Sequence, residues 1–237
     1  MRIVLAGYGR MGHLIESMAQ ERGHEVIGHV DITNTEDWQT MPAADVVLDF
    51  SNPGMLRPLA DYIRRTGAAL VEGTTGYSEE DLALLHSLAE YAPVIHSANY
   101  SLGVAVFRHL LQQIPASVRD SFDIEILEKH HRHKIDAPSG TAKQLLAAVD
   151  PEHRRKVVTG REGIVGERTH DEIGVMALRG GSVAGEHTVY FFGEDETLAI
   201  THTASSRRIF AGGALQTAEK LCGREKGLYQ LDDLIFG

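Results

Sequence analysis

The first hundred residues alternate short apolar runs with segments in which apolar residues recur at helical spacing. The runs have the length of strands, and turn-forming residues follow most of them. They are residues 2–6, 25–30, 45–50, 68–72 and 93–97. Because strands that alternate with helices favour a parallel sheet covered on both faces, we predict a doubly wound α/β domain.

Capping residues mark the starts of two helices in this region. Ser78 and Asp81 have the spacing of a capping box before a leucine-rich helix. Residues 51–53, Ser-Asn-Pro, offer caps and a first-turn proline to another helix, which Gly67 ends. These signals fix where the strands give way to helices.

After about residue 115 the pattern changes to strands joined by turns, with one clear helix that starts near Ala142. The expected strands are residues 122–127, 174–179, 186–192 and 197–203, the last two joined as an antiparallel hairpin. A long helix after Ser206 should return to the first domain, because connections are usually short. We therefore predict one domain from residues 1–101 and 207–237, and an α+β sheet domain from residues 102–206.

A glycine motif joins the first strand to the first helix. Gly7, Gly9 and Gly12 have the G-x-G-x-x-G spacing, in which the glycines allow a tight turn, close approach of a pyrophosphate and helix packing. Asp31 ends the second strand, where an acid that binds ribose is expected. The domain is therefore predicted to be Rossmann-like and to bind a dinucleotide.

Ligands of such sheets bind beyond the carboxyl ends of the strands. The loops expected there hold Ser51, Gly73, Thr74, Thr75, Ala98, Asn99 and Tyr100. For Ser51 and Asn52, ordinary helix capping is an equally good interpretation.

Residues 129–134 gather three histidines and three fixed cations. Ser139-Gly140-Thr141 follows as a helix start, whose unpaired N–H groups can bind an anion. Neighbouring cations favour neutral imidazoles, and His130 and Lys134 share a face at a spacing of four. The segment is thus suited to anions and protons, although a solvated basic turn is the alternative. A metal site at the histidines is not expected, since no cysteine or acid stands at ligand spacing.

Composition narrows the function classes. The formal charge of −10 argues against nucleic acid as a partner, and no apolar run is long enough to cross a membrane. We read no export signal at the amino terminus. The single cysteine, Cys222, excludes an intramolecular disulfide and agrees with a cytoplasmic location.

Five motifs together closely resemble the 4-hydroxy-tetrahydrodipicolinate reductase family of lysine and diaminopimelate biosynthesis. They are residues 7–12, 49–51, 73–76, 128–142 and 185–188. The resemblance implies reduction of a small cyclic imine dicarboxylate by NADH or NADPH. It also implies a Rossmann-like domain, and a sheet domain that binds substrate and forms a homotetramer.

Residue roles follow from the resemblance by motif position. His130 would be the proton donor and Lys134 a second one, while His131, Gly140 and Thr141 would contact substrate. The cofactor would be held by Gly7, Tyr8, Gly9, Arg10, Met11, Gly12, Asp31, Gly73, Thr74, Thr75, Ser97, Ala98, Asn99 and Tyr100.

The cofactor preference is expected to favour NADH. Members of the family that favour NADPH tend to place a basic side chain after the acid, whereas Ile32 follows Asp31 here. Arg10 could still meet a 2′-phosphate, so dual use is expected. A dinucleotide-sensing regulator and another Rossmann dehydrogenase are alternatives that do not require the segment around His130. A metal-dependent enzyme that uses the histidines is a third alternative, and it predicts loss of activity on chelation, which we do not expect.

Overall fold

The chain folds into two compact units, and this computed structural model describes all 237 residues. Unit 1 comprises Met1–Leu102 and Arg208–Gly237, and unit 2 comprises Gly103–Arg207. No helix combines the length and the apolar character that a bilayer crossing requires.

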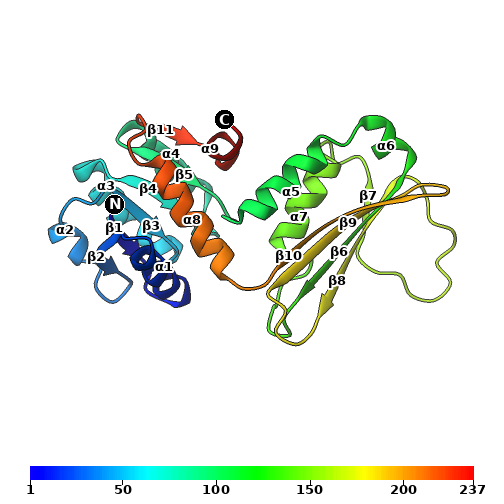
Figure 1. Ribbon diagram of the computed structural model, residues 1–237, viewed down its shortest axis with the longest axis horizontal. Helices are drawn as coiled ribbons and strands as arrows, with labels where there is room; N and C mark the ends of the chain where they lie inside the picture. Colours follow the sequence, from blue (N-terminus) through cyan, green and yellow to red (C-terminus); the bar gives the residue numbers. More distant parts are fainter. The chain divides into compact units, whose positions relative to one another are not determined.

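Unit 1 is built on a six-stranded parallel sheet with the order β11-β5-β4-β3-β1-β2 (Figure 1). The strands are β1 (Arg2–Ala6), β2 (Glu25–Val30), β3 (Val46–Asp49), β4 (Ala69–Glu72), β5 (Pro93–His96) and β11 (Gly227–Tyr229). The predicted parallel, doubly wound sheet is confirmed. Its sixth strand was not predicted, because three residues are too few to show a periodic pattern.

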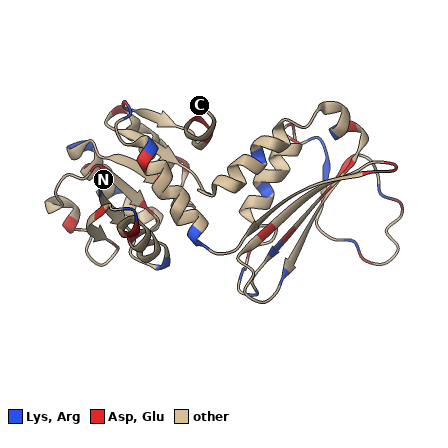
Figure 2. Ribbon diagram, in the orientation of Figure 1, with Lys and Arg blue, Asp and Glu red and all other residues tan.

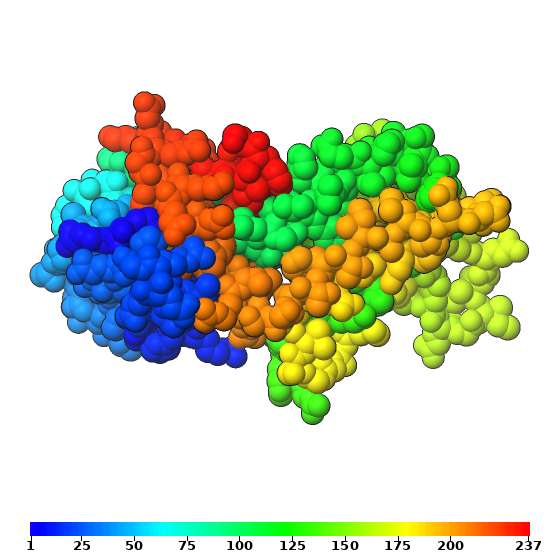
Figure 3. All heavy atoms as spheres, viewed as in Figure 1, coloured from blue at the N-terminus to red at the C-terminus, as the bar shows by residue number.

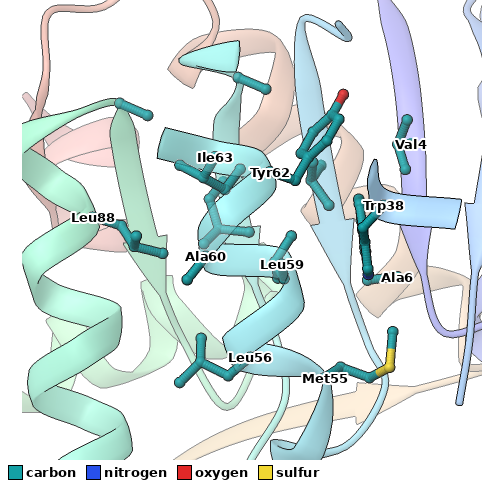
Figure 4. Close-up of a cluster of buried hydrophobic side chains, with 14 of the residues drawn as sticks. Val4, Ala6, Trp38, Met55, Leu56, Leu59, Ala60, Tyr62, Ile63 and Leu88 are labelled. Carbon is teal, nitrogen blue, oxygen red and sulfur yellow. The ribbon is translucent and has the colours of Figure 1, made fainter. Parts of the chain in front are cut away.

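Helices cover this sheet. They are α1 (Arg10–Glu21), α2 (Asp37–Thr40), η1 (Pro53–Met55), α3 (Leu56–Thr66), α4 (Glu79–Ser87), η2 (Leu88–Glu90), α8 (Arg208–Leu221) and α9 (Leu231–Phe236). The amino-terminal α1 packs against the carboxy-terminal α8 (Figures 1 and 3). Buried side chains of α3, such as Leu59 and Ile63, fill one core together with Trp38 (Figure 4). Both β3 and β4 are buried along their whole length, so their ends are fixed by packing.

The predicted helix caps are present, with one difference. Ser78 and Asp81 form the capping box of α4, and Gly67 ends α3 in the left-handed conformation with φ 69°. At η1 the side chain of Asn52 accepts from Gly54 N. The side chain of Ser51 instead bonds to Asp49, so Asn52 alone caps this turn.

Unit 2 contains a mixed five-stranded sheet with the order β10-β9-β6-β8-β7. The strands are β6 (Asp123–His130), β7 (Lys156–Val158), β8 (Glu172–Arg179), β9 (Gly185–Phe192) and β10 (Thr197–Ala204). The predicted antiparallel hairpin of β9 and β10 is confirmed, and β6 pairs antiparallel with β9 but parallel with β8.

The expectation of a single helix in this region was wrong. Unit 2 has α5 (Leu102–Gln112, which begins at the last residue of unit 1), α6 (Ala116–Ser121) and α7 (Gly140–Val149). Buried Phe107 and Leu111 of α5 and Leu145 of α7 pack into one cluster with the sheet. The short α6 has no buried residue, so it leaves no apolar pattern in the sequence.

Candidate active site

A fully buried carboxylate, Glu128, organises the polar centre of unit 2. Its Oε2 accepts from His130 Nδ1 at 2.6 Å and from Arg179 Nη1 at 2.7 Å. Its Oε1 accepts from Ser139 N at 3.0 Å and from Arg179 Nη2 at 2.8 Å. Four donors from three segments of the chain therefore converge on one side chain.

The strands explain this convergence. Glu128 and His130 are two residues apart on β6 and so lie on the same face of the sheet. Arg179 on β8 is the register partner of His130, which places its guanidinium beside Glu128. Figure 2 shows acidic and basic residues on these neighbouring strands.

These contacts keep Glu128 ionised. Burial acts to raise the pKa of Glu128, but hydrogen bonds from Arg179, His130 and Ser139 outweigh it and hold the pKa below its usual value. An ionised carboxylate only accepts, so His130 Nδ1 must carry a proton and Nε2 is the ring nitrogen left for reaction. A side chain at Gly185 would crowd this nitrogen, because an added Cβ would lie 3.1 Å from it.

The start of α7 is tied to the same centre. Ser139 caps the helix by accepting from Ala142 N at 3.1 Å, and its Oγ lies 3.0 Å from His187 Nε2. Burial, followed by the nearby His130, lowers the pKa of His187 to about 4. The neutral ring of His187 shares a hydrogen bond with the Ser139 hydroxyl, which holds that hydroxyl at the start of α7. No atom lies within 4 Å of a Cβ built on exposed Gly140, so this helix start is open to a ligand.

The other predicted residues of the cluster bond elsewhere. Lys134 Nζ lies 2.8 Å from Asp136 Oδ1, and this contact lowers the pKa of Asp136. His131 Nε2 lies 3.4 Å from Arg207 Nη2, and burial together with the charge of Arg207 lowers the pKa of His131. The structure thus joins His130 to the start of α7 through Glu128, whereas Lys134 and His131 lie on the adjoining loop.

Sequence reasoning assigned no role to four members of this centre. Glu128, Ser139 and His187 lie inside the motifs singled out in the sequence, and the same-face spacing of Glu128 and His130 could have linked them. Arg179 had no comparable signal, because only strand pairing brings it to Glu128.

In unit 1 the glycine motif forms a close-packed turn. Gly7 has φ +85°, and a Cβ there would lie 2.8 Å from Phe50 O. A Cβ at Gly12 would lie 2.4 Å from Gly7 O, whereas one at Gly9 would meet nothing within 4 Å. No side chain caps α1 at Gly9. The space above Gly9 and the uncapped N–H groups of α1 therefore fit a pyrophosphate.

The acid at the end of β2 is preorganised. Asp31 Oδ1 accepts from Thr33 N at 2.7 Å and from Thr33 Oγ1 at 2.6 Å, and these bonds lower the pKa of Asp31. The adjacent Ile32 is 69% exposed. Tyr8 of the glycine motif stacks on the His29 ring with 3.8 Å between centroids. Exposed Arg10 begins α1, and Met11 follows it.

The loops after β4 and β5 lie at the same sheet edge as the glycine motif. Gly73 has no room for a side chain, since a Cβ would lie 2.4 Å from the Phe50 ring. Thr75 is exposed, and Ser97 Oγ donates to Asn99 O at 2.9 Å beside Ala98.

Two residues predicted to contact the cofactor are mostly buried. Tyr100 is 1% exposed and donates from its hydroxyl to Glu72 O at 2.6 Å. Thr74 is 4% exposed and donates to Asp49 Oδ1 at 3.0 Å. The hydrogen bonds of these two side chains point into the sheet. The side chains therefore support the loops and do not form a ligand surface.

Comparison with known families covers both units. The family described as "Dihydrodipicolinate reductase, N-terminus" matches residues 1–100, and "Dihydrodipicolinate reductase, C-terminus" matches residues 103–235. Among curated relatives, a 4-hydroxy-tetrahydrodipicolinate reductase of Sulfurovum sp. (strain NBC37-1) is 41% identical, over 98% of this chain and 97% of the relative. One from Staphylococcus epidermidis is 40% identical, over 99% of this chain and 100% of the relative.

Solved structures share the fold. A dipicolinate-bound dihydrodipicolinate reductase from Paenisporosarcina sp. TG-14 superposes with a TM-score of 0.74 at 24% identity, over 97% of each chain. A myo-inositol dehydrogenase from Corynebacterium glutamicum reaches a TM-score of 0.54 at 14% identity, over 99% of this chain and 92% of that one. At these identities the likeness concerns the fold alone.

Proposed function

The chain belongs to the dihydrodipicolinate reductase family, and on that premise we propose that it reduces 4-hydroxy-tetrahydrodipicolinate to tetrahydrodipicolinate with a nicotinamide dinucleotide. The observation that carries this proposal is the Glu128–His130 pair, joined through Ser139 to the open start of α7. A proton donor and an anion-binding helix start are the two groups that reduction of a dicarboxylate imine requires.

Residues of unit 2 bind and protonate the substrate in this proposal. The N–H groups at Gly140 and Thr141 bind one carboxylate, with His131 and Lys134 as further contacts. Loss of water would give a conjugated imine, and a nicotinamide dinucleotide held by the glycine motif and Asp31 would supply hydride to its ring C4. Negative charge then moves onto C3 and the ring nitrogen, where the nearby cations stabilise it. His130 Nε2 delivers the proton to C3, and Lys134 is the second proton donor.

Residues of unit 1 hold the dinucleotide. Gly7, Gly9, Gly12 and the first turn of α1 bind the pyrophosphate, and Asp31 binds the ribose hydroxyls. Tyr8, Arg10 and Met11 line the same turn, while Gly73 to Thr75 and Ser97 to Tyr100 form the remaining loops. The 2′-phosphate of NADPH would face the negative charge of Asp31, and the adjacent Ile32 carries no positive charge to offset it. NADH should therefore serve at least as well as NADPH.

The test is steady-state reduction of the product of dihydrodipicolinate synthase, with NADH and NADPH compared side by side. A dinucleotide-sensing regulator would bind NADH without turnover. Another dehydrogenase would ignore this substrate, and a metal-dependent enzyme would lose activity on chelation. Asp31→Ser with Ile32→Arg should shift kcat/KM toward NADPH by about 1–3 kcal/mol. An unchanged preference would mean that the 2′ position is read elsewhere.

Variants of the proton donors separate their roles. His130→Gln should lower kcat by about 100-fold or more with little change in KM. Lys134→Ala should impair both parameters, because one cation serves a carboxylate and the charge on the ring. Wild-type turnover of the His130 variant would remove this residue from the mechanism.

Assembly and location belong to the proposal as well. A homotetramer is supported by exposed apolar residues on the second sheet, Leu178, Phe192 and Leu198. Sedimentation analysis of the purified protein tests it. The cytoplasm is proposed as the location from the single cysteine, Cys222.

A further inference from the structure

Two acidic side chains, Asp49 and Glu72, lie buried next to each other in the sheet of unit 1. They are the last residues of β3 and β4 and are register partners in the parallel sheet. Both are 0% exposed. The proposed function gives neither of them a role, although burying two acids in contact is costly unless their charge is neutralised.

Their hydrogen bonds use only half of the carboxyl oxygens. Asp49 Oδ1 accepts from Ser51 N at 2.9 Å, from Ser51 Oγ at 2.5 Å and from Thr74 Oγ1 at 3.0 Å. Glu72 Oε1 accepts from Thr74 N at 2.7 Å. Asp49 Oδ2 and Glu72 Oε2 are buried, and no protein group donates to them. A single proton on one of these oxygens supplies the donor that the other lacks.

No cation compensates the pair. The titratable groups around it are Tyr77 after β4, His96 on β5 and Tyr100 after β5, and His96 bonds to Thr74 O rather than to a carboxyl. On the neighbouring strand β1, Ala6 is the register partner of Asp49. The buried residues of α8 are apolar or small, apart from Thr217.

The environment favours the protonated state. Burial, and then the charge of Asp49, raises the pKa of Glu72 well above its usual value, while burial raises the pKa of Asp49 to a lesser degree. Two carboxyl groups that are neighbours in a buried site do not both ionise near neutral pH.

The pair anchors four loops at this edge of the sheet. Ser51, held by Asp49, lies against the glycine motif, since a Cβ on Gly7 would be 2.8 Å from Ser51 Cα. Thr74 is bonded to both carboxyls. The backbone oxygen of Glu72 accepts from Ser97 N at 3.0 Å and from the Tyr100 hydroxyl at 2.6 Å. The loops after β1, β3, β4 and β5 therefore meet at two residues.

We propose that Asp49 and Glu72 share one proton and form a positioning pair that holds these four loops in the geometry that binds the dinucleotide. The inference rests on the proposed function for its ligand. With one shared proton the pair carries a single negative charge. Asp49 can then accept from Ser51 and Thr74 without facing a second carboxylate.

Direct binding of NADH, followed by its fluorescence without substrate, tests the positioning role. Asp49→Ala should raise Kd for NADH by about tenfold or more, because the loops of Ser51 and Thr74 lose their common acceptor. Asp45→Ala is the matched control, since Asp45 precedes the same strand at its opposite end, where it accepts from Arg2 N. KM for the imine substrate should not change in either variant.

The shared proton has its own readouts. Infrared spectra of the wild type at pH 7 should contain the carbonyl band of a protonated carboxyl group, and Glu72→Gln should remove it. Kd for NADH should rise in the wild type as the pH becomes alkaline, and Glu72→Gln, which keeps a neutral donor, should abolish that rise. Glu72→Gln thus tests the presence of the proton, because it keeps nearly the same side-chain volume.

The outcomes separate the two proposals. If the wild type binds no dinucleotide, the proposed function fails. If it binds NADH and Asp49→Ala binds equally well, only the positioning role fails. If the infrared band is absent from the wild type, the shared proton is wrong, whether or not the variants fold.

Discussion

Two buried acidic centres, one in each unit, lie at strand ends and are neutralised in different ways. In unit 2, Glu128 is surrounded by the Arg179 guanidinium, the His130 imidazole and the Ser139 amide. In unit 1, Asp49 and Glu72 face each other with hydroxyl and amide donors but no cation. The Arg179 cation compensates the charge of the first centre, whereas in our proposal a shared proton reduces the charge of the second from two to one.

The difference bears on what each centre can do. An ionised Glu128 orients the ring of His130 and leaves Nε2 for a ligand, so this centre is suited to proton transfer. A carboxyl pair that keeps its proton transfers none to a ligand. It holds loops in place instead. Cations therefore mark the centre suited to chemistry, and their absence marks the centre suited to support.

The two centres should also respond to pH in opposite directions. Folding lowers the pKa of Glu128. Its contribution to stability is therefore present at pH values above the ordinary pKa of a glutamate, and it is lost on acidification. His187, with a pKa lowered to about 4, adds to that loss between about pH 6.5 and 4. Folding raises the pKa of Glu72. Its contribution therefore lowers the stability as the pH rises above the ordinary pKa of a glutamate.

The largest effect should come from removing the cation of the first centre. Arg179→Met leaves Glu128 buried without its guanidinium and should lower the free energy of unfolding by roughly 3–5 kcal/mol, measured by urea denaturation. Adding Glu128→Gln should restore part of the loss, because the buried charge is then gone.

Arg161→Met is the control for that variant. Arg161 bridges Glu125 and Glu172 on the same sheet, and its side chain is 32% exposed, so its loss should cost about 1 kcal/mol or less. Equal losses for both arginines would contradict the distinction between a fully buried carboxylate and a partly exposed ion-pair cluster.

The next effect concerns turnover. Glu128→Gln should lower kcat by about 10- to 100-fold, because His130 loses the carboxylate that orients its ring. KM for NADH should stay near the wild-type value, since Glu128 belongs to unit 2. A rise in that KM with unchanged kcat would reverse the roles given to the two centres.

A smaller effect should appear in the pH dependence of unfolding. Stability of the wild type should decline as the pH rises from the ordinary pKa of a glutamate to the raised pKa of Glu72, by up to about 1.4 kcal/mol per pH unit, the slope for one proton. Glu72→Gln should flatten this decline, whereas Glu128→Gln should change the loss of stability below the ordinary pKa of a glutamate. Calorimetric melting over the pH range measures both slopes, and one shared profile would show that the centres do not differ.

The smallest effect is expected at the cap of α7. Ser139→Ala removes the side chain that caps Ala142 N but keeps the amide that donates to Glu128. It should cost about 1 kcal/mol of stability. Activity should fall less than in Glu128→Gln, and a larger fall would mean that the hydroxyl itself takes part in the reaction.

Local sequence was enough for five of the six strands of unit 1 and for the loops that follow them. Short apolar runs, glycines and caps are signals carried by neighbouring residues, so the parallel sheet and the capping box at Ser78 could be predicted. The short strand β11 and helix α6 were missed, because a few residues with little burial show no periodicity.

The candidate site divides in the same way. The residues around His130 and the glycine motif stand out in the sequence by composition and spacing, which are local properties. What only the tertiary structure decided is which partner neutralises each buried acid. Arg179 reaches Glu128 from 51 residues away through the pairing of β6 and β8, and Glu72 meets Asp49 through the register of β3 and β4. Burial and charge at these centres depend on strands that pair across long sequence separations, and no local pattern encodes that pairing.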